Sequence, residues 1–394
     1  MRTTESNAVK VVTEGTHRVR EPEHTWELMR PKLARYDVTR VSDVTGLDTL
    51  NIPVVMAARP TSWTLCVSQG KGQSLMLAKV SAVMECIELW HAEHAVPQPT
   101  YAGVPATELE LSYSLGDLGV VTGPFLNDST PIDWVPAVGL VSGTVIPVPR
   151  AAIAFPDPTT QQWSAAFIRP NSNGLASGNV LDEAALHGLY EVVERDVLCG
   201  PTPDELTTIP AIDPESISDE TCLGMVRAVH DAGGKVSVQP LPNPYDIPTF
   251  RVQAWSWDFP FPCGGYGSHS DPNVAVSRAV TEAAQGRLAA IVGSRDDLED
   301  YYSYLERPRR KAEYLAQFPA PSTTLESTTP QLGPRYDDVG EELTWLARTV
   351  ERVVGHEPLM VDLSTDSDFA VAKVIVPGAT FEGNRVHSRL ERPA

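Results

Sequence analysis

The chain has 394 residues, of which 42% are apolar and 21% are charged, an ordinary composition for a globular protein with a sizeable core. Its formal net charge of −20 at pH 7 argues against nonspecific binding to nucleic acid or to an anionic membrane, because both would repel an acidic protein. The sequence shows no secretory signal, no apolar run near the roughly 20 residues of a membrane span, and no Cys-x-x-Cys pair among five scattered cysteines, so we expect a soluble cytoplasmic protein.

The predicted elements alternate between helices and strands, and no clean linker divides the chain. Residues 1–34 are expected to form an amino-terminal arm, poorly ordered to about residue 24 and then entering a short helix. Alternating β-branched and small residues predict strands, and long apolar segments without Gly or Pro predict helices. The strands are expected at residues 52–60, 63–72, 130–155 (as a hairpin), 235–241, 249–257, 358–364 and 370–378. The helices are expected at residues 73–94, 181–198, 271–294 and 340–354, with an irregular excursion at about 300–338. This order is typical of an α/β or α+β fold.

The first long helix holds two glutamates in an apolar segment. "SAVMECIELW", residues 81–90, places Glu85 and Glu88 three positions apart among apolar neighbours. At roughly 100° per residue, both fall on one helix face with the small residues Ala78, Ser81 and Ala82. A carboxylate is rarely buried without a partner, so this face is expected to meet something cationic.

The second and third helices repeat the arrangement. Glu183, His187, Glu191 and Glu194 share an arc of roughly 80° on the second helix. In the third helix the polar residues at positions i, i+4 and i+7, set among small residues, are Arg278, Glu282 and Gln285. On spacing alone, an E-x-x-E pair is more often a solvated helix face, and that alternative stays open.

Converging carboxylates favour a metal site. Four of them without cations would repel one another and raise their pKa values, so metal ions are the natural complement. Oxygen ligands without a Cys or His set favour Mg²⁺, which commonly completes its shell with phosphate oxygens and therefore indicates a nucleotide. Neither G-x-x-x-x-G-K-[ST] nor G-x-G-x-x-G occurs, but the glycine-rich segments "GKGQS" and "NSNGLASGN" each lead into an E-x-x-E helix. "HAEH", residues 91–94, is expected to be a helix end, and Trp255 and Trp257 are expected to pack.

Three segments resemble, in order and spacing, the signature blocks of YcaO-domain proteins. They are "SQGKGQSLMLAKVSAVMECIE", "NSNGLASGNVLDEAALHGLYEVVERD" and "GYGSHSDPNVAVSRAVTEAAQGRL", within residues 66–90, 171–196 and 264–288. "DVTRVSDVTGLDTLNIPVVMAARP" is similar to the usual beginning of that domain, so the resemblance covers about residues 35–300. It implies an α+β fold with mixed β-sheets packed against long helices, as a single large YcaO domain over residues 35–394.

The resemblance also implies an ATP- and Mg²⁺-dependent enzyme that activates a peptide backbone amide by O-phosphorylation. A nucleophile then attacks the amide carbon and phosphate leaves, so no residue need be a covalent nucleophile. The implied Mg²⁺ ligands are Glu85, Glu88, Glu191 and Glu194. The implied nucleotide-binding residues are Ser68, Lys71, Asn179, Glu183, Arg195, Arg278, Glu282 and Gln285, of which Arg195 and Arg278 are also the implied catalytic phosphate contacts.

Two ends of the sequence bear on the expected partners. Members that make azolines with a partner commonly end in Pro-x-Pro-x-Pro, whereas this sequence ends "RVHSRLERPA". From the roughly 40 residues that precede the domain, we expect no winged-helix module of the kind that usually binds a leader peptide in this family. "VAKVIVPGATFEG" resembles the carboxyl end of stand-alone and TfuA-associated members. The expected partners are a precursor peptide and either a leader-binding or a TfuA-like protein, and a homodimer stays open.

Three hypotheses follow for the function in the biosynthesis of a ribosomally made peptide. The first is a stand-alone cyclodehydratase, in which a Cys, Ser or Thr side chain gives an azoline and an amine gives an amidine ring. The second is a thioamide synthase acting with a TfuA-like partner and sulfide. The third is a non-catalytic ATP-binding partner of another modifying enzyme.

Overall fold

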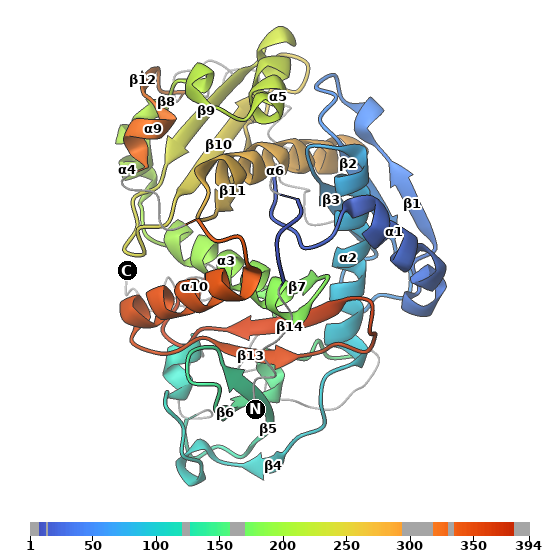
Figure 1. Cartoon of the computed structure of the whole chain (residues 1–394), viewed down its shortest axis with the longest axis vertical. Coiled ribbons are helices and arrows are strands. Elements are labelled where there is room, and N and C mark those ends of the chain that lie inside the picture. The colour runs from blue at the N-terminus through green and yellow to red at the C-terminus, as the bar shows by residue number, and fades with distance from the viewer. Residues whose placement is uncertain are drawn as a thin grey trace, which may run out of the picture.

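Three strand–helix units form the centre of the computed structural model, which describes residues 8–12, 15–119, 127–157, 170–293, 318–329 and 335–381 (Figure 1). In each unit a glycine-containing strand leads directly to a long helix. The units are β3 (Val67–Lys71) with α2 (Leu75–His94), β7 (Leu175–Gly178) with α3 (Leu181–Leu198), and β11 (Cys263–Ser268) with α6 (Pro272–Val292). Figure 1 shows the three helices gathered around the middle of the molecule.

Glycines let each strand lie against the main chain of its own helix. A Cβ atom added to Gly70 of β3 would lie 2.0 Å from a backbone oxygen of α2. At Gly178 of β7 it would lie 2.4 Å from a backbone nitrogen of α3, and at Gly265 of β11 it would lie 2.1 Å from a backbone oxygen of α6. No side chain fits at these points, so all three units share the same close contact between main chains.

Antiparallel sheets carry the first and third units. α2 packs on a sheet of order β1-β2-β3, and α6 packs on a sheet of order β11-β10-β9. The added strands are β1 (Arg40–Asp43), β2 (Val54–Ala58), β9 (Lys235–Pro240) and β10 (Thr249–Trp255). Near β9, a two-stranded parallel sheet pairs β8 (Ala211–Ile212) with β12 (Pro321–Thr323), and the helices α4 (Pro203–Thr208), α5 (Glu220–Asp231) and α9 (Leu325–Thr328) complete this region.

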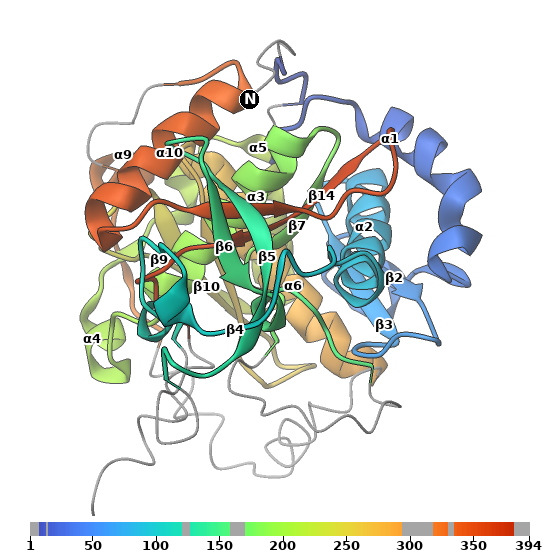
Figure 2. The ribbon, with the colours of Figure 1, turned by 90° about the horizontal axis from the view of Figure 1, so that it is seen from below.

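The second unit belongs to a larger antiparallel sheet of order β4-β5-β13-β14-β7, in which β6 pairs with β5. Its other strands are β4 (Tyr101–Val104), β5 (Ile132–Gly139), β6 (Val145–Pro149), β13 (Leu359–Asp362) and β14 (Ala370–Ile375). Figure 2 shows the β5–β6 hairpin with α10 (Val339–Val354) and α2 on opposite sides of it in that view. α1 (Pro22–Met29) and short 3₁₀ helices at 30–36, 45–47, 106–108, 115–118, 150–152 and 214–216 complete the described elements.

Each central helix turns its apolar face away from the other two. Ile87 of α2, Leu189 of α3 and Val276 of α6 are fully buried and belong to three separate apolar clusters. Because the apolar faces are used for these clusters, the polar faces of the three helices are left to meet one another. None of the described helices is long and apolar enough to cross a membrane.

The α+β class, the four long helices and the β5–β6 hairpin are confirmed. The strands that were not predicted are β4, β7, β8, β11 and β12. Of these, β7 and β11 belong to the central units and lie inside "NSNGLASGN" and "CGGYGSH", which are rich in glycine, a residue of low strand propensity. The expectation of a poorly ordered arm is wrong for residues 15–24, which contact Asn179 just after β7, Glu183 of α3 and His269 just after β11. Within the expected excursion, residues 321–328 form β12 and α9, while residues 300–317 and 330–334 lie outside the described residues, as does the carboxyl-terminal sequence from residue 382.

Candidate functional site

The polar faces of α2, α3 and α6 line one cavity of about 320 Å³. Most of the side chains predicted from the sequence meet there, although they come from three distant parts of the chain. Those in the lining are Lys71, Glu85, Glu88, Asn179, Glu183, Glu191, Glu194, Arg195, Arg278, Glu282 and Gln285. The first unit supplies an ammonium and two carboxylates, the second supplies five polar side chains from α3, counting His187, and the third supplies a guanidinium, a carboxylate and an amide.

Glu85 and Glu88 of α2 are held by different elements. The Glu85 carboxylate accepts a hydrogen bond from the backbone N–H of Gln69 in β3 at 2.9 Å. The Glu88 carboxylate accepts one from the Ser177 hydroxyl of β7 at 2.5 Å, which ties the first unit to the second. Burial, together with the charges of Glu85 and Glu191, raises the pKa of Glu88 to about 8.

Glu191 and Glu194 of α3 are also incompletely neutralised. Burial raises the pKa of Glu191, although its side chain keeps 23% exposure towards the cavity. Burial and the charge of Glu282 raise the pKa of Glu194 to about 7. Among the described residues, Arg195 pairs with Glu191, but its Nη2 lies 3.9 Å from Glu191 Oε1, too far for a hydrogen bond. Both carboxylates therefore retain capacity for a cationic ligand.

A buried lysine behind Glu191 was missed by the sequence analysis. Lys373 of β14 is 3% exposed, and its Nζ donates to the carbonyl oxygens of Asn171 at 2.6 Å and Asn173 at 2.8 Å. Burial lowers the pKa of Lys373 to about 8, while Glu191 acts in the opposite direction. Lys373 therefore fixes the segment that leads into β7. Its only signal in the sequence was a single lysine within the apolar run "AVAKVIVPG".

The third unit brings one cation, Arg278, and a further acid, Glu282, to the cavity. Arg278 Nη1 donates to Nε2 of His187 on α3 at 3.0 Å, so His187 is an acceptor at that nitrogen. Burial and the Arg278 charge lower the pKa of His187 well below its usual value, which keeps the ring neutral. Glu282 pairs with Lys71 of β3 at 2.6 Å, and Gln285 Nε2 donates to the backbone oxygen of Gln69 at 2.7 Å. These contacts join α6 to both other units.

The cavity's side chains fit Mg²⁺ and a phosphate group. Glu88, Glu191 and Glu194 have raised pKa values because the described groups around them do not fully stabilise their charges. A divalent cation would remove that penalty, and hard cations prefer oxygen ligands. The Nε atoms of Arg195 and Arg278 are buried without a hydrogen-bond partner among the described residues, and phosphate oxygens are suitable acceptors for them.

Asn179 and Glu183 reach the cavity but are already engaged. The Glu183 carboxylate accepts hydrogen bonds from the Asn179 backbone and side chain and from the Val19 backbone N–H at 2.9 Å. The Asn179 side-chain oxygen accepts from the Thr25 hydroxyl at 2.8 Å and from Arg20 Nη1 at 3.3 Å. In this structure the two residues anchor the amino-terminal segment, and their nucleotide-binding role stays a prediction.

The amino-terminal segment supplies lining residues that the sequence analysis did not find. Gly15, Thr16, Arg18 and Arg20 all line the cavity. Arg18 Nη1 lies 3.7 Å from the Glu183 carboxylate. Residues 15–20, "GTHRVR", are polar and lack helical or strand periodicity, so the sequence did not indicate that they occupy a fixed position. Their one signal is a pair of arginines at alternate positions.

Three further predictions have different outcomes. Ser68 is 1% exposed, lies beside the Cys86 thiol and is absent from the cavity lining, so the structure does not bring it to the site. "HAEH" is confirmed as the end of α2. Trp255 is buried as expected. Trp257 packs edge-to-face on Trp255 but is 61% exposed, so the expected packing holds only in part for Trp257.

Residues 69–380 match the family described as YcaO cyclodehydratase, ATP- and Mg²⁺-binding. An uncharacterised protein of Mycobacterium tuberculosis (strain H37Rv) is 37% identical over 369 residues, which are 92% of this chain and 82% of that protein. A protein encoded in the tfuA 3′ region of Rhizobium leguminosarum bv. trifolii is 38% identical over 303 residues, which are 73% of this chain and 70% of that protein.

Solved structures share the fold. A YcaO protein from Methanopyrus kandleri bound with AMPPCP and Mg²⁺ superposes with a TM-score of 0.75 at 22% identity, covering 98% of this chain and 99% of that one. A heterocyclase in complex with substrate and cofactor gives a TM-score of 0.76 at 22% identity and covers 96% of this chain. This chain spans 54% of the length of that heterocyclase.

Proposed function

Because the chain belongs to the YcaO cyclodehydratase family, whose members bind ATP and Mg²⁺, we propose that it activates a backbone amide of a ribosomally made precursor peptide by O-phosphorylation. The main support is the convergence of carboxylates from α2 and α3 on one cavity, where burial and mutual repulsion raise the pKa of Glu88 to about 8. Such a site is costly to the protein unless a cation binds there.

Each group in the cavity has a proposed role. Bound ATP and Mg²⁺ supply a transferable phosphoryl group with its charge partly neutralised. Glu85, Glu88, Glu191 and Glu194 hold the metal. Lys71, Arg195 and Arg278 orient the phosphates, and the network of His187, Gln285 and Lys373 fixes those side chains and the strands that carry them. Catalysis by positioning and charge neutralisation needs no covalent nucleophile from the protein.

The nucleophile that attacks the activated amide carbon decides the product. We propose a ring-forming reaction, in which a neighbouring Cys, Ser, Thr or amine group of the peptide attacks, phosphate leaves, and an azoline or amidine results. A second candidate is thioamide formation, in which sulfide attacks with the help of a TfuA-like partner. The support for this second reaction is that a relative 38% identical to this chain is encoded in a tfuA region.

The product mass tests both candidates. The protein is incubated with ATP, Mg²⁺ and the precursor peptide encoded beside it, with and without sulfide and the TfuA-like protein where one is encoded there. Loss of one water from the peptide supports a ring, and exchange of one oxygen for sulfur supports a thioamide. An unchanged mass for every neighbouring peptide, with no peptide-dependent ATP consumption, contradicts amide activation.

Three glutamine variants test the site assignment. Glu85→Gln and Glu191→Gln should each abolish peptide-dependent ATP hydrolysis, because each removes a metal ligand while preserving side-chain size. Glu220→Gln, on the exposed surface of α5, is the control and should behave as the wild type. Turnover at wild-type rates in both cavity variants would overturn the metal-site assignment.

A further inference from the structure

Residues 8–12 and 15–20, here called the strap, run into the space that α2, α3 and α6 surround (Figure 1, dark blue). Its first residues pair with the segment that begins α10. Val9 and Asp338 form an antiparallel bridge, the Lys10 N–H donates to the Asp337 oxygen at 2.8 Å, and the Val339 N–H donates to the Ala8 oxygen at 3.0 Å. One end of the strap is therefore fixed to α10.

A buried ion pair reinforces that attachment. Lys10 Nζ lies 2.6 Å from Glu342 Oε2 of α10, and the two side chains are 3% and 0% exposed. Lys10 Nζ also donates to the Tyr336 carbonyl oxygen at 2.6 Å. The other Glu342 oxygen accepts hydrogen bonds from the Tyr190 hydroxyl at 2.7 Å and from the Ser270 hydroxyl. Separating Lys10 from Glu342 would leave two buried charges without a partner. The strap is therefore held firmly against α10.

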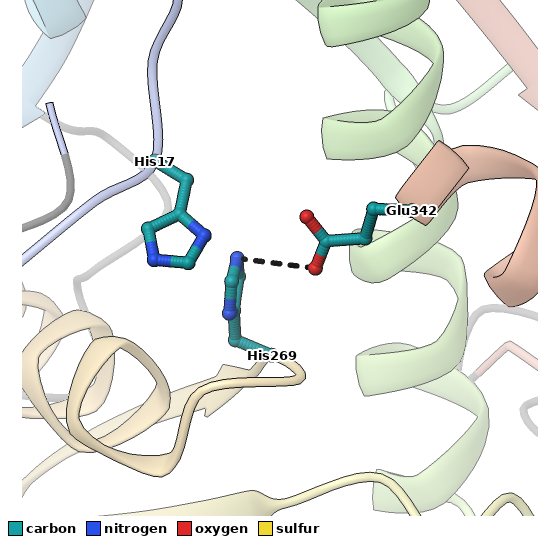
Figure 3. Close-up of side chains that lie close together, drawn as sticks. All are labelled: His17, His269 and Glu342. Atoms are coloured by element: carbon teal, nitrogen blue, oxygen red, sulfur yellow. Dashed lines mark ion pairs between the residues drawn. The ribbon is translucent and has the colours of Figure 1, made fainter. Parts of the chain in front are cut away.

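Two histidines fix the strap a second time (Figure 3). The His17 ring meets the His269 ring edge-on, with ring centres 4.5 Å apart and planes at 89°. His269 in turn stacks on Tyr190 of α3, with ring centres 4.7 Å apart. Burial and the Lys10 charge lower the pKa of His17 to about 4, and burial lowers that of His269 well below its usual value. Both rings are therefore neutral, and their contact is an apolar edge-to-face packing.

His17, His269 and Glu342 also lie close enough to hold a metal ion, with one possible ligand atom of each within 4.8 Å of the others. Two observations argue against that use. Nδ1 of His269 accepts the Asp271 backbone N–H at 2.9 Å, so in the neutral ring the proton is on Nε2, the nitrogen that faces Glu342. Glu342 is already neutralised by Lys10. The cluster is better matched to holding the strap than to holding a cation.

Arg18 follows His17 directly and lines the cavity, whereas Lys10, His17, His269 and Glu342 do not. We propose that the Lys10–Glu342 pair and the His17–His269 contact, together called the latch, position Arg18 in the nucleotide pocket. Glu342 is thus a positioning residue for nucleotide binding although it lies outside the cavity lining. This inference rests on the proposed nucleotide pocket. It implies that the affinity for the nucleotide depends on how α10 holds the strap.

The test measures binding of AMPPCP with Mg²⁺ by isothermal titration calorimetry. The variant pairs Lys10→Met with Glu342→Gln, so that no buried charge is left unpaired. It should weaken binding about tenfold, the typical effect of losing one charge-assisted hydrogen bond. Arg18→Ala should weaken binding to a similar extent. Adding Arg18→Ala to the double variant should weaken it no further, because both changes remove the same contact. In turnover assays the KM for ATP should rise while kcat at saturating ATP stays unchanged.

The control and the contrary outcomes are distinct. Arg227→Met with Glu215→Gln removes a half-exposed ion pair beside α5 and should leave the affinity unchanged. If the double latch variant fails to fold, His17→Ala, which keeps the ion pair, carries the same expectation. Wild-type affinity in the latch variants, or effects that add to that of Arg18→Ala, overturn the latch. Failure of the wild type to bind AMPPCP instead overturns the proposed function.

Discussion

Lys71 of β3 and Glu282 of α6 form an ion pair 2.6 Å long that joins the first and third strand–helix units beside the cavity. Although burial acts to raise the pKa of Glu282, the Lys71 ammonium and Arg195 lower it, so this carboxylate is charged while Glu194 nearby has a raised pKa. Glu282 is therefore neutralised by its neighbours, whereas Glu88, Glu191 and Glu194 are not. We expect the Lys71 ammonium, which pairs with Glu282, to contact a phosphate as well.

Replacing Lys71 should therefore weaken nucleotide binding. We expect Lys71→Met to raise the Kd for AMPPCP with Mg²⁺ about tenfold, as for the loss of one charge-assisted hydrogen bond. Lys71→Arg should retain part of the affinity because the positive charge is kept. Calorimetric titration measures both, and an unchanged Kd for Lys71→Met would show that the ammonium does not contact the nucleotide.

Removing one of the crowded carboxylates should stabilise the metal-free protein. Glu88→Gln removes the cost of folding with a carboxyl whose pKa burial raises to about 8, and we expect the free energy of unfolding in EDTA at pH 7 to rise by about 1–3 kcal/mol. The same variant should lose most of the extra stability that saturating Mg²⁺ and ATP give the wild type. Urea unfolding with EDTA and with Mg²⁺ and ATP measures both effects. A variant less stable than the wild type in EDTA would contradict the repulsion between these acids.

His187 should matter through Arg278. Its Nε2 accepts a hydrogen bond from Arg278 Nη1 at 3.0 Å, so His187→Leu should let the guanidinium move and lower kcat/KM for ATP about tenfold. His187→Gln can still accept that hydrogen bond and should lose less. Steady-state kinetics, with circular dichroism to check folding, distinguish the two variants. Equal losses in both would assign the effect to packing instead of to the arginine.

Lowering the pH should destabilise the protein because of His91, which lies near the end of α2. Burial lowers its pKa to about 4, while Nδ1 lies 2.7 Å from the Ile87 carbonyl oxygen and Nε2 lies 2.9 Å from the Thr365 hydroxyl. The folded pKa is below the unfolded value, so this contribution is complete above about pH 6.5 and is lost towards pH 4. The loss is about 3 kcal/mol. Urea unfolding of the wild type and His91→Gln from pH 7 to pH 4 tests this, and parallel pH profiles would contradict it.

Glycine substitutions test the contact between strands and helices. Gly70→Ala should destabilise the protein by about 3 kcal/mol or more, because its Cβ would lie 2.0 Å from the backbone of α2 and neither backbone can move cheaply. Gly224→Ala is the control, since nothing lies within 4 Å of the new Cβ on the exposed face of α5. It should stabilise by about 1 kcal/mol through helix propensity. Thermal unfolding measures both, and a stable Gly70→Ala variant would contradict the close approach.

The helices of the site could be predicted from the sequence, and its strands only in part. α2, α3 and α6 were predicted because a long segment with apolar and small residues at helical spacing strongly favours one secondary structure, the α-helix. Their acids could be placed on one face for the same reason. β7 and β11 could not, because their glycines serve the approach to a helix, and a single sequence does not distinguish that use from a turn.

The strap and the buried cations required the tertiary structure. Lys10 gives no local signal for its pairing with Glu342, a residue more than three hundred positions away, and Lys373 looks like an interruption of a strand until its two carbonyl acceptors are seen. Ser68 shows a different limit. The family resemblance implies that it lies by the nucleotide with Lys71, but residues an odd number of positions apart on a strand face opposite sides, and Ser68 is absent from the cavity lining.

Since Gly70, Gly178 and Gly265 each leave main chain against main chain, no side chain sets the spacing between a strand and its helix. The apolar residues on the outer faces of α2, α3 and α6 can therefore be exchanged over evolutionary time while the acids keep their places. Peptide substrates and partner proteins can change around such a centre. We expect the glycines to be as restricted as the glutamates when members of this family diverge.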